Sequence, residues 1–265
     1  MIKKIIIFLP SFESGGVERN AVYFANGLAS HGFDVHLFYC RESSKWFSEL
    51  DKRVQRVKII RIPLALILHD RLVDALSMLL FSLPKIKLVR DSCPTAIISF
   101  QSNIIAILLS HIAKVRIAVR ISNHFDAAQH ENSLLRKLSE VGKRWTYRFA
   151  DIVIANSREL ADEYQPILKK RVGTIFNPVD FKSIDHLKQL EVTDDIFVRK
   201  SRPIVISAGR LTSQKNYVLL LNAMALVMKS HACDLVILGE GEQKEHLIQL
   251  SNDLGIEKSV HFLGY

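Results

Sequence analysis

An arginine and a lysine five residues apart follow a short apolar run in the last third of the chain. In VISAGRLTSQKN, Val205–Asn216, Arg210 comes directly after Gly209, and Lys215 precedes a segment of helical pattern. Two cations at the start of a helix, where the backbone is already positive, are unfavourable without an anion. A planar guanidinium and an ammonium group suit a diphosphate, and each charge-assisted contact contributes about 1.5–3 kcal/mol. We predict a diphosphate site here; two solvated side chains are the alternative.

A glycine pair precedes the first helical pattern of the chain. Gly15 and Gly16, in SFESGGVERN, follow the first apolar run. In an open parallel sheet, ligands bind beyond the carboxyl ends of the strands, and glycines let backbone N–H groups approach an anion or a sugar closely. Both glycines are therefore candidates for substrate binding, and a tight turn is the alternative.

A third candidate group, RISNH, ends another apolar run. His124 follows Arg120 and Asn123, and the three side chains could hydrogen-bond a sugar hydroxyl or a phosphate. A structural or exposed histidine is the alternative. Glu240, in the stretch GEGEQK, is a further candidate for ligand binding. That stretch lacks the third glycine of a dinucleotide fingerprint, which disfavours a nicotinamide enzyme. No histidine pair in the sequence has the spacing of metal ligands. We therefore expect neither a cofactor nor a metal.

The composition fits a globular protein with an anionic partner. The 265 residues are 48% hydrophobic, and 36 lysines and arginines against 27 acidic residues give a net charge of +9. Such a charge favours a nucleotide, a nucleic acid or an anionic membrane surface. Nucleic acid is disfavoured, because no exposed platform of interleaved basic and aromatic residues is evident. A steep dependence of RNA or DNA affinity on salt would support that disfavoured interpretation.

The N-terminal sequence and the cysteines predict a cytoplasmic protein. Cys40, Cys93 and Cys233 are widely spaced and odd in number, as expected for buried thiols. The first apolar run is short and breaks at Pro10, which indicates a strand rather than a signal peptide. No stretch reaches the roughly 18 apolar residues that span a bilayer, because Arg71–Leu83 contains Asp74 and is followed by a proline. We expect a soluble or peripheral protein.

The elements that must position these residues alternate along the chain. Short runs rich in Ile, Val and Phe alternate with segments of helical period, which predicts parallel sheets covered by helices. Val17, Ala21, Phe24, Ala25 and Leu28 share one predicted helix face, and Gly32 ends that helix. Residues 181–202 are charged with weak periodicity and are predicted to be a linker. We therefore expect one Rossmann-like domain at 1–180 and a second, partial Rossmann-like domain at 203–265.

A basic, aromatic-bearing helix is predicted around residues 133–150, SLLRKLSEVGKRWTYRFA. Such a helix could rest on anionic lipid headgroups at the inner face of the cytoplasmic membrane. A core-facing aromatic stripe with a solvated basic face is the alternative, and it is the interpretation that the pattern favours.

Several separated motifs together resemble one known family. These are ESGGVERN, RISNH, ADIVIANSREL, IFNPVD, SAGRLTSQKNYVLLLNAMALV, LVILGEGEQKEHLIQL and VHFLGY, which occur in this order. The sequence resembles the retaining glycosyltransferases of family 4, whose GT-B fold has two Rossmann-like domains. The resemblance implies that the donor is a nucleotide-sugar, namely a UDP-sugar. It also implies that the acceptor is a lipid-linked or lipopolysaccharide-type glycan.

The resemblance also implies a role for each candidate residue. Arg210 and Lys215 would hold the donor diphosphate and stabilise the leaving group, Gly16 would bring its loop to the donor, and His124 would contact the transferred sugar. Protein cations would meet the phosphate charge without a metal, so electrostatic stabilisation would be the main catalytic contribution.

One departure from the family affects the expected activity. The family carries a pair of donor-binding glutamates after the VHFLGY strand, and this sequence ends at Tyr265. We therefore expect the second domain to be incomplete and the activity of this chain to be reduced. The alternative function is an inactive remnant or a binding module that keeps the acceptor domain.

Overall fold

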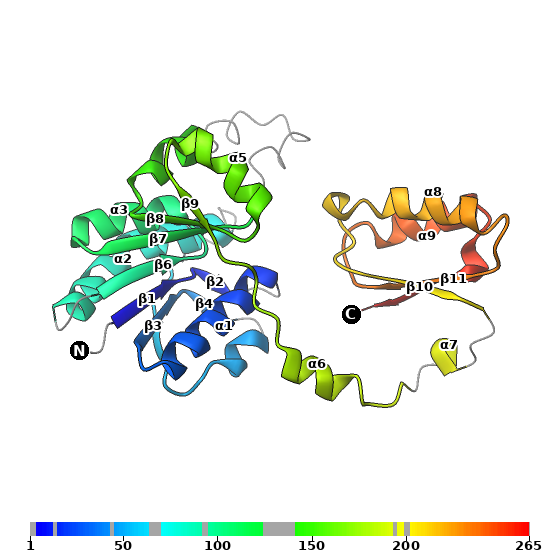
Figure 1. Cartoon of the computed structure of the whole chain (residues 1–265), viewed down its shortest axis with the longest axis horizontal. Helices are drawn as coiled ribbons and strands as arrows, with labels where there is room; N and C mark the ends of the chain where they lie inside the picture. Colours follow the sequence, from blue (N-terminus) through cyan, green and yellow to red (C-terminus); the bar gives the residue numbers. More distant parts are fainter. Residues whose placement is uncertain are drawn as a thin grey trace. The chain divides into compact units, whose positions relative to one another are not determined.

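The computed structural model describes residues 4–12, 15–42, 45–63, 70–91, 95–123, 141–192, 195–198 and 202–264. The chain divides into two compact units, Met1–Val179 and Asp180–Tyr265, and each is built around a sheet of its own (Figure 1). The domain boundary expected after residue 180 lies one residue from this division. The expected start of the second Rossmann-like domain at 203 directly precedes the first strand of the second unit.

The first unit is built on a parallel sheet. In the described residues it has seven strands in the order β5-β3-β1-β6-β7-β8-β9. Their bounds are β1 Lys4–Phe8, β3 Asp34–Tyr39, β5 Gln55–Lys58, β6 Thr95–Ser99, β7 Arg116–Ile121, β8 Ile152–Ala155 and β9 Val172–Thr174. Two short strands, β2 (Ser11–Phe12) and β4 (Arg41–Glu42), form a separate parallel pair. The predicted parallel α/β architecture is confirmed.

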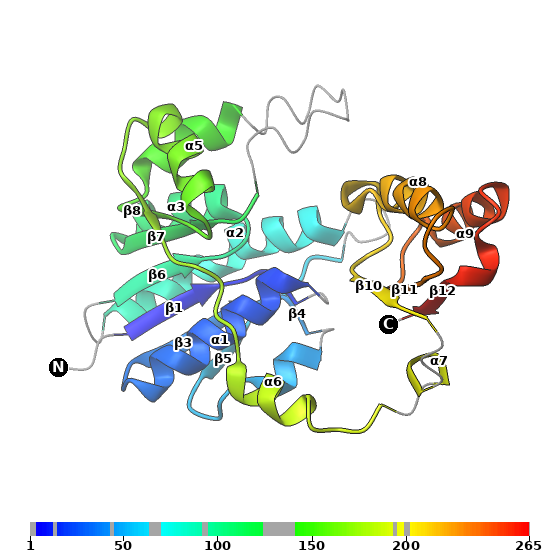
Figure 2. The same ribbon diagram turned by 45° about the vertical axis from the view of Figure 1, so that its right-hand side comes forward.

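Helices cover both faces of this sheet (Figure 2). They are α1 Gly16–Ser30, α2 Asp70–Arg90, α3 Asn103–Ala113 and α5 Arg158–Leu168, with a further helical stretch at residues 141–146 and short 3-10 turns η1 Lys45–Glu49 and η2 Tyr147–Phe149. Successive residues of β1 point to opposite faces, as in any strand. Ile6 packs in one core with Met78 of α2, whereas Ile7 packs in another with Ala21 of α1. The first helix therefore buries the predicted face, and Gly32, at φ 82°, follows its end.

The apolar stretch Arg71–Leu83, which a proline follows in the sequence, belongs to a longer helix in the structure. α2 runs through Pro84 and continues to Arg90. Pro84 is exposed, and Ile86 and Val89 beyond it are buried in the core, so their packing outweighs the backbone hydrogen bond that proline removes. The apolar run VKIIRIP at residues 57–63 predicts a strand, but the observed strand, β5, lies earlier, at Gln55–Lys58.

The cysteine interpretation is confirmed where the structure describes the residues. Cys40 and Cys233 are free and buried, whereas Cys93 lies outside the described residues. Burial raises the pKa of the Cys40 thiol to about 12, and the nearby charge of Asp74 acts in the same direction. This thiol is protonated and unreactive at neutral pH.

The second unit is a smaller sheet with helices packed against it. The described residues form three parallel strands in the order β10 (Ile204–Ala208), β11 (Asp234–Leu238) and β12 (Val260–Gly264). α8 (Tyr217–Val227) and α9 (Lys244–Asp253) pack on this sheet around a core that includes Leu221, Leu235 and Leu247. The 3-10 turns η3 (Ser213–Lys215) and η4 (Glu257–Ser259) precede α8 and β12. The predicted order of strands and helices is confirmed.

The segment expected to be an irregular linker contains two short helices. α6 spans Phe181–Leu187 and α7 spans Asp195–Val198. The Asp180 carboxylate caps α6 by accepting a hydrogen bond from Ser183 N at 3.1 Å, a local interaction that forms without a periodic apolar stripe. The large apolar residues of α6 are exposed, including Phe181 (70%) and Leu187 (60%), so the segment lacks a core of its own.

Candidate functional site

The predicted diphosphate loop lies at the carboxyl end of β10. Arg210 and Lys215 are both exposed, and Leu211 between them is fully buried in the core of the second unit. Neither cation forms an ion pair with any described residue. The loop is therefore anchored by an apolar side chain while its two charged side chains stay in solvent.

The loop is also fixed by backbone hydrogen bonds to the segment that follows β11. Gly209 N donates to Leu238 O at 2.9 Å, Leu211 N donates to Glu240 O at 3.0 Å, and Gln243 N donates to Leu211 O at 3.1 Å. These contacts bring two strand ends together at one sheet edge. The two cations consequently project from a rigid backbone.

Glycines make this backbone contact possible. A Cβ on Gly239 would lie 1.9 Å from Gly209 O, and a Cβ on Gly241 would lie 2.3 Å from Leu211 O. Gly239 also has φ 157°, which other residues rarely adopt. The sequence stretch GEGEQK therefore has a structural role: its two glycines let one loop pack against the other.

The start of α8 differs from the simple helix end that the sequence suggested. Lys215 belongs to the 3-10 turn η3, and Asn216, at φ 49°, separates that turn from α8. The Asn216 side chain accepts a hydrogen bond from Leu219 N at 3.4 Å and so caps the helix. Glu240, the other predicted donor-binding residue of this unit, is exposed and pairs with Lys244 at 2.9 Å.

In the first unit, Gly15 and Gly16 lie where the sequence places them, at the start of α1. Gly15 is the N-cap residue, and a Cβ on it would lie 2.5 Å from Oε2 of the buried Glu18. Gly16 has open space around it. Glu18 accepts a hydrogen bond from Gln101 Nε2 at 2.8 Å, so the glycine turn is joined to the end of β6. Gln101 was not predicted from the sequence.

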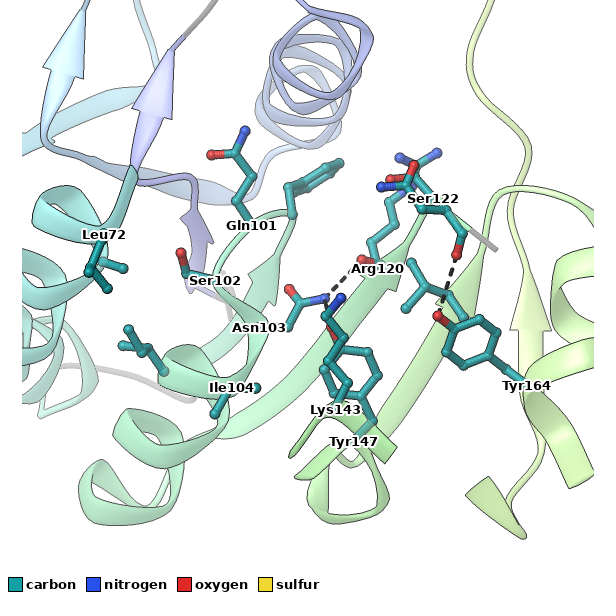
Figure 3. A pocket seen from close by; sticks show the side chains of 15 residues that line it. Leu72, Gln101, Ser102, Asn103, Ile104, Arg120, Ser122, Lys143, Tyr147 and Tyr164 are labelled. Carbon is teal, nitrogen blue, oxygen red and sulfur yellow. Dashed lines mark hydrogen bonds between the residues drawn. The ribbon is translucent and has the colours of Figure 1, made fainter. Parts of the chain in front are cut away.

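A pocket of about 520 Å³ opens beside the ends of β6 and β7 (Figure 3). Two predicted residues, Arg120 and Asn123, line it. The other lining residues are Leu72, Ala75, Phe100, Gln101, Ser102, Asn103, Ile104, Ile105, Ile121, Ser122, Lys143, Tyr147 and Tyr164. His124 lies outside the described residues, so its predicted contact with the sugar stays a prediction.

Arg120 is the most unusual side chain of this pocket. It is only 3% exposed, its Nε has no hydrogen-bond partner in the part of the chain that the structure describes, and a terminal nitrogen donates to Asn177 Oδ1. Its guanidinium lies 5.6 Å from the ring centre of Phe24 and 5.5 Å from that of Phe100. Burial lowers the pKa of Arg120, because removing the guanidinium from water disfavours its charge.

A polar network holds the pocket wall in place. Asn103 Nδ2 donates to Arg120 O at 3.1 Å and lies 3.2 Å from the Tyr147 hydroxyl, and Asn103 Oδ1 accepts from Ser99 Oγ at 2.7 Å. Tyr164 donates from its hydroxyl to Asn123 O at 3.4 Å. These residues come from β6, α3, β7, η2 and α5. In the sequence, the only sign of these residues is that polar side chains stand close to the ends of the apolar runs.

The favoured interpretation of the basic aromatic helix is wrong for most of its described aromatic residues. Tyr147 is buried, but Trp145 and Phe149 are 66% and 55% exposed and do not form a core-facing stripe. Residues 133–140 of that predicted helix lie outside the described residues. The exposed rings pack on each other, with centres 6.1 Å apart.

Comparisons with known proteins identify the family. Residues 14–183 match the family model described as Glycosyltransferase Family 4, and residues 190–265 match that of Glycosyl transferases group 1. The amylovoran biosynthesis glycosyltransferase AmsD of Erwinia amylovora is 27% identical over 99% of this chain and 69% of AmsD. An N-acetylgalactosaminyltransferase of Campylobacter jejuni, named for a diacetylbacillosaminyl-diphospho-undecaprenol substrate, is 26% identical over 100% of this chain and 70% of that enzyme.

Solved structures show the same fold. The crystal structure of Anabaena HepE in complex with UDP-glucose matches with a TM-score of 0.66 at 18% identity, covering 99% of this chain and 69% of HepE. WaaG, a glycosyltransferase involved in lipopolysaccharide biosynthesis, matches with a TM-score of 0.67 at 12% identity, covering 98% of this chain and 70% of WaaG. Both units therefore have the Rossmann-like architecture of GT-B enzymes. With the family model matching residues 14–183, the chain belongs to glycosyltransferase family 4.

Proposed function

We propose that this chain binds a UDP-sugar and transfers the sugar, with retention of configuration, to a lipid-linked or lipopolysaccharide-type glycan. The observation that supports this most strongly is the loop after β10, where exposed Arg210 and Lys215 project from a fixed backbone without an ion-pair partner among the described residues. Anabaena HepE has been crystallised with UDP-glucose, and the Campylobacter relative is named for a diphospho-undecaprenol substrate.

In this proposal the two cations act on the leaving group. When the bond between sugar and diphosphate breaks, negative charge grows on the departing phosphate oxygens. Arg210 donates from a planar fork and Lys215 supplies a compact charge, so both contacts strengthen as that charge develops. These side chains meet the phosphate charge themselves, and the proposal includes no metal or other cofactor. Gly16, with open space around it, would let its loop approach the donor, and His124 would contact the transferred sugar.

The test is equilibrium binding of UDP, measured by isothermal titration calorimetry. The double variant Arg210→Ala/Lys215→Ala should weaken UDP binding by roughly 100-fold or more, because it removes two charge-assisted contacts. The control is Arg202→Ala/Lys229→Ala, which removes the same charges from exposed positions of the second unit outside this loop. Unchanged UDP affinity in the first variant, or equal losses in both, would refute the proposed clamp.

Sugar transfer itself decides between an enzyme and a binding module. The chain covers 69–70% of the relatives named above. We expect UDP-sugar binding with turnover onto a prenyl diphosphate-linked sugar, unchanged by a chelator, and an α-linked product from an α-linked donor. Binding that depends on Arg210 and Lys215 without any transfer would assign the chain the alternative function of a binding module.

We also propose that the first unit contacts a membrane surface from the cytoplasmic side. The apolar patch consists of Ile104, Leu108, Ile112, Val141, Trp145 and Phe149, all exposed. The two helical segments that carry it are adjacent, because a Cβ on Gly142 would lie 3.7 Å from Ile104 Cδ1 and the rings of His111 and Phe149 are 6.4 Å apart. No described helix is long and apolar enough to cross a bilayer.

Basic residues accompany the apolar patch. Lys114, Arg144 and Arg148 are exposed on the same segments. Apolar rings that enter the interface and cations that meet anionic headgroups are the two contributions that hold a peripheral protein on a bilayer. Such contact would place the pocket of the first unit close to a lipid-linked acceptor.

A further inference from the structure

We propose that Arg120 binds an oxyanion, a phosphoryl or carboxylate group, that belongs to the acceptor substrate. This inference deepens the proposed function and rests on it for the existence of an acceptor. It starts from the buried cation of the pocket in the first unit. The described residues that line this pocket include the buried Arg120 and neither Asp nor Glu (Figure 3).

The guanidinium of Arg120 is buried without a compensating charge. The side chain is 3% exposed, and no described carboxylate pairs with it. Removing an ion from water without a counter-charge is costly, and buried arginines are ordinarily paired with acids. The rings of Phe24 and Phe100 offset part of this cost through cation–π contact, at 5.6 and 5.5 Å. The remaining cost is removed when an anion enters the pocket.

The hydrogen bonds of Arg120 indicate what kind of group is missing. One terminal nitrogen donates to the neutral Asn177 side chain, and Nε–H has no acceptor among the described residues. With aromatic rings near the guanidinium, its N–H edges are the donors left for a ligand. A tetrahedral phosphate or planar carboxylate accepts two such N–H bonds and neutralises the charge. A sugar hydroxyl accepts hydrogen bonds but leaves the charge in place, so an anion fits this position better.

Arg120 and the loop after β10 belong to different units of the chain. Arg120 lies on β7 of the first unit, whereas Arg210 and Lys215 belong to the second. A second anion site in the unit that the family resemblance assigns to the acceptor fits an acceptor that carries its own charge. Two sources supply such a charge: the diphosphate of a lipid carrier and the carboxylate of an acidic sugar.

The test uses the full chain with Arg210→Ala/Lys215→Ala, so that the loop after β10 cannot contribute to anion binding. The probe is inorganic pyrophosphate, and the readout is the arginine Nε–H region of proton–nitrogen NMR spectra, with the Arg120 signal identified by its loss in Arg120→Lys. We expect this signal to shift and saturate with pyrophosphate. We also expect Arg120→Gln to weaken pyrophosphate binding at least tenfold, whereas Arg116→Gln, an exposed change on the same strand, does not.

Two outcomes would overturn the proposal. The Arg120 signal could stay unchanged at saturating pyrophosphate, farnesyl diphosphate and glucuronate, which would make Arg120 a purely structural tie between β7 and Asn177. Alternatively, UDP alone could move the signal, which would assign the site to the donor. If Arg120→Gln does not fold, the spectra of the protein that retains Arg120 decide the question.

Titrations with two further ligands identify the source of the anion. Saturation by farnesyl diphosphate supports a lipid diphosphate, and saturation by glucuronate supports an acidic sugar. If the proposed donor clamp is wrong, UDP affinity will instead be unchanged by substitution of Arg210 and Lys215. That result would leave the pyrophosphate response of Arg120 unchanged, so the two failures are distinguishable.

Discussion

At the scale of single residues, buried charge has opposite consequences at two places in the first unit. Arg120 is buried with no described acid beside it, whereas Asp74, fully buried on α2, is paired twice. Asp74 accepts from Arg41 Nε at 2.6 Å and from Arg61 Nε at 2.8 Å. The paired carboxylate joins the segments around β4 and residue 61 to α2. The guanidinium without a described counter-charge is instead the group for which we propose an anionic ligand.

The Asp74 pairing predicts a large loss of stability when the charge is removed. Asp74→Asn should lower the free energy of unfolding by about 3 kcal/mol, because it removes the buried carboxylate that Arg41 and Arg61 share and leaves them only the half-exposed Asp70. Urea titration followed by circular dichroism measures this change. The matched control is Asp91→Asn, which breaks an exposed pair with Arg90 and should not change the midpoint measurably. Equal effects of the two substitutions would contradict the assignment.

The glycine after β11 provides a second residue-scale prediction. Gly239→Ala should lower the stability of the second unit and weaken UDP binding together, since its Cβ would collide with Gly209 O in the loop that carries Arg210. Gly255→Ala is the control: Gly255 has φ 68° but open space around it, so its cost should be only about 1 kcal/mol with UDP affinity retained. Calorimetric UDP titration and thermal unfolding separate the two effects. Retained UDP affinity in Gly239→Ala would show that the loop contact does not position the clamp.

At the scale of elements, the apolar patch predicts binding to anionic vesicles. Trp145→Ser/Phe149→Ser should weaken binding to phosphatidylglycerol vesicles by roughly tenfold, because each exposed ring contributes apolar area that enters the interface. Vesicle co-sedimentation measures this, with Ile60→Ser/Ile175→Ser as a control that removes exposed apolar side chains outside the patch. Vesicle binding that is equal in both variants would argue against the patch as the contact surface.

The sequence was most informative about helices and strands, because the spacing of apolar residues shows which face of each element is buried. The alternating pattern predicted the strands and helices of both units, including β10, α8, β11, α9 and β12 in order. It failed at Pro84, where the packing of Ile86 and Val89 keeps α2 helical, and at Trp145, where an apolar pattern lies on the surface. A local sequence pattern does not show which other element of the fold covers a given face of a helix or strand.

The candidate site was predicted only in part, and for a related reason. Arg210, Lys215 and the glycines could be recognised because their chemistry is local to one loop. Gln101 and Tyr147 could not, because their contacts with Glu18 and Asn103 depend on strands that are distant in sequence. Arg120 was placed among the candidates, but its charge without a described counter-ion is a property of the folded chain.

At the scale of the whole molecule, the buried cores suggest two separate unfolding events. The first unit contains two hydrophobic cores, and the core around Leu221 and Leu247 lies entirely within the second. We therefore expect urea unfolding in two transitions, with Asp74→Asn shifting one and Gly239→Ala shifting the other. Tryptophan fluorescence reports the first unit alone, because Trp46 and Trp145 both belong to it. A single transition moved equally by either substitution would show that the units unfold together.

The outer flank of β10 has a consequence for how this polypeptide behaves at high concentration. Among the described strands β10 pairs only with β11, and Val205 and Ile206 are 39% and 54% exposed. An extended segment from any source could add its amide and carbonyl groups to that flank and cover these aliphatic side chains. Association of this kind at high concentration would therefore act on the strand that leads into the loop of Arg210 and Lys215.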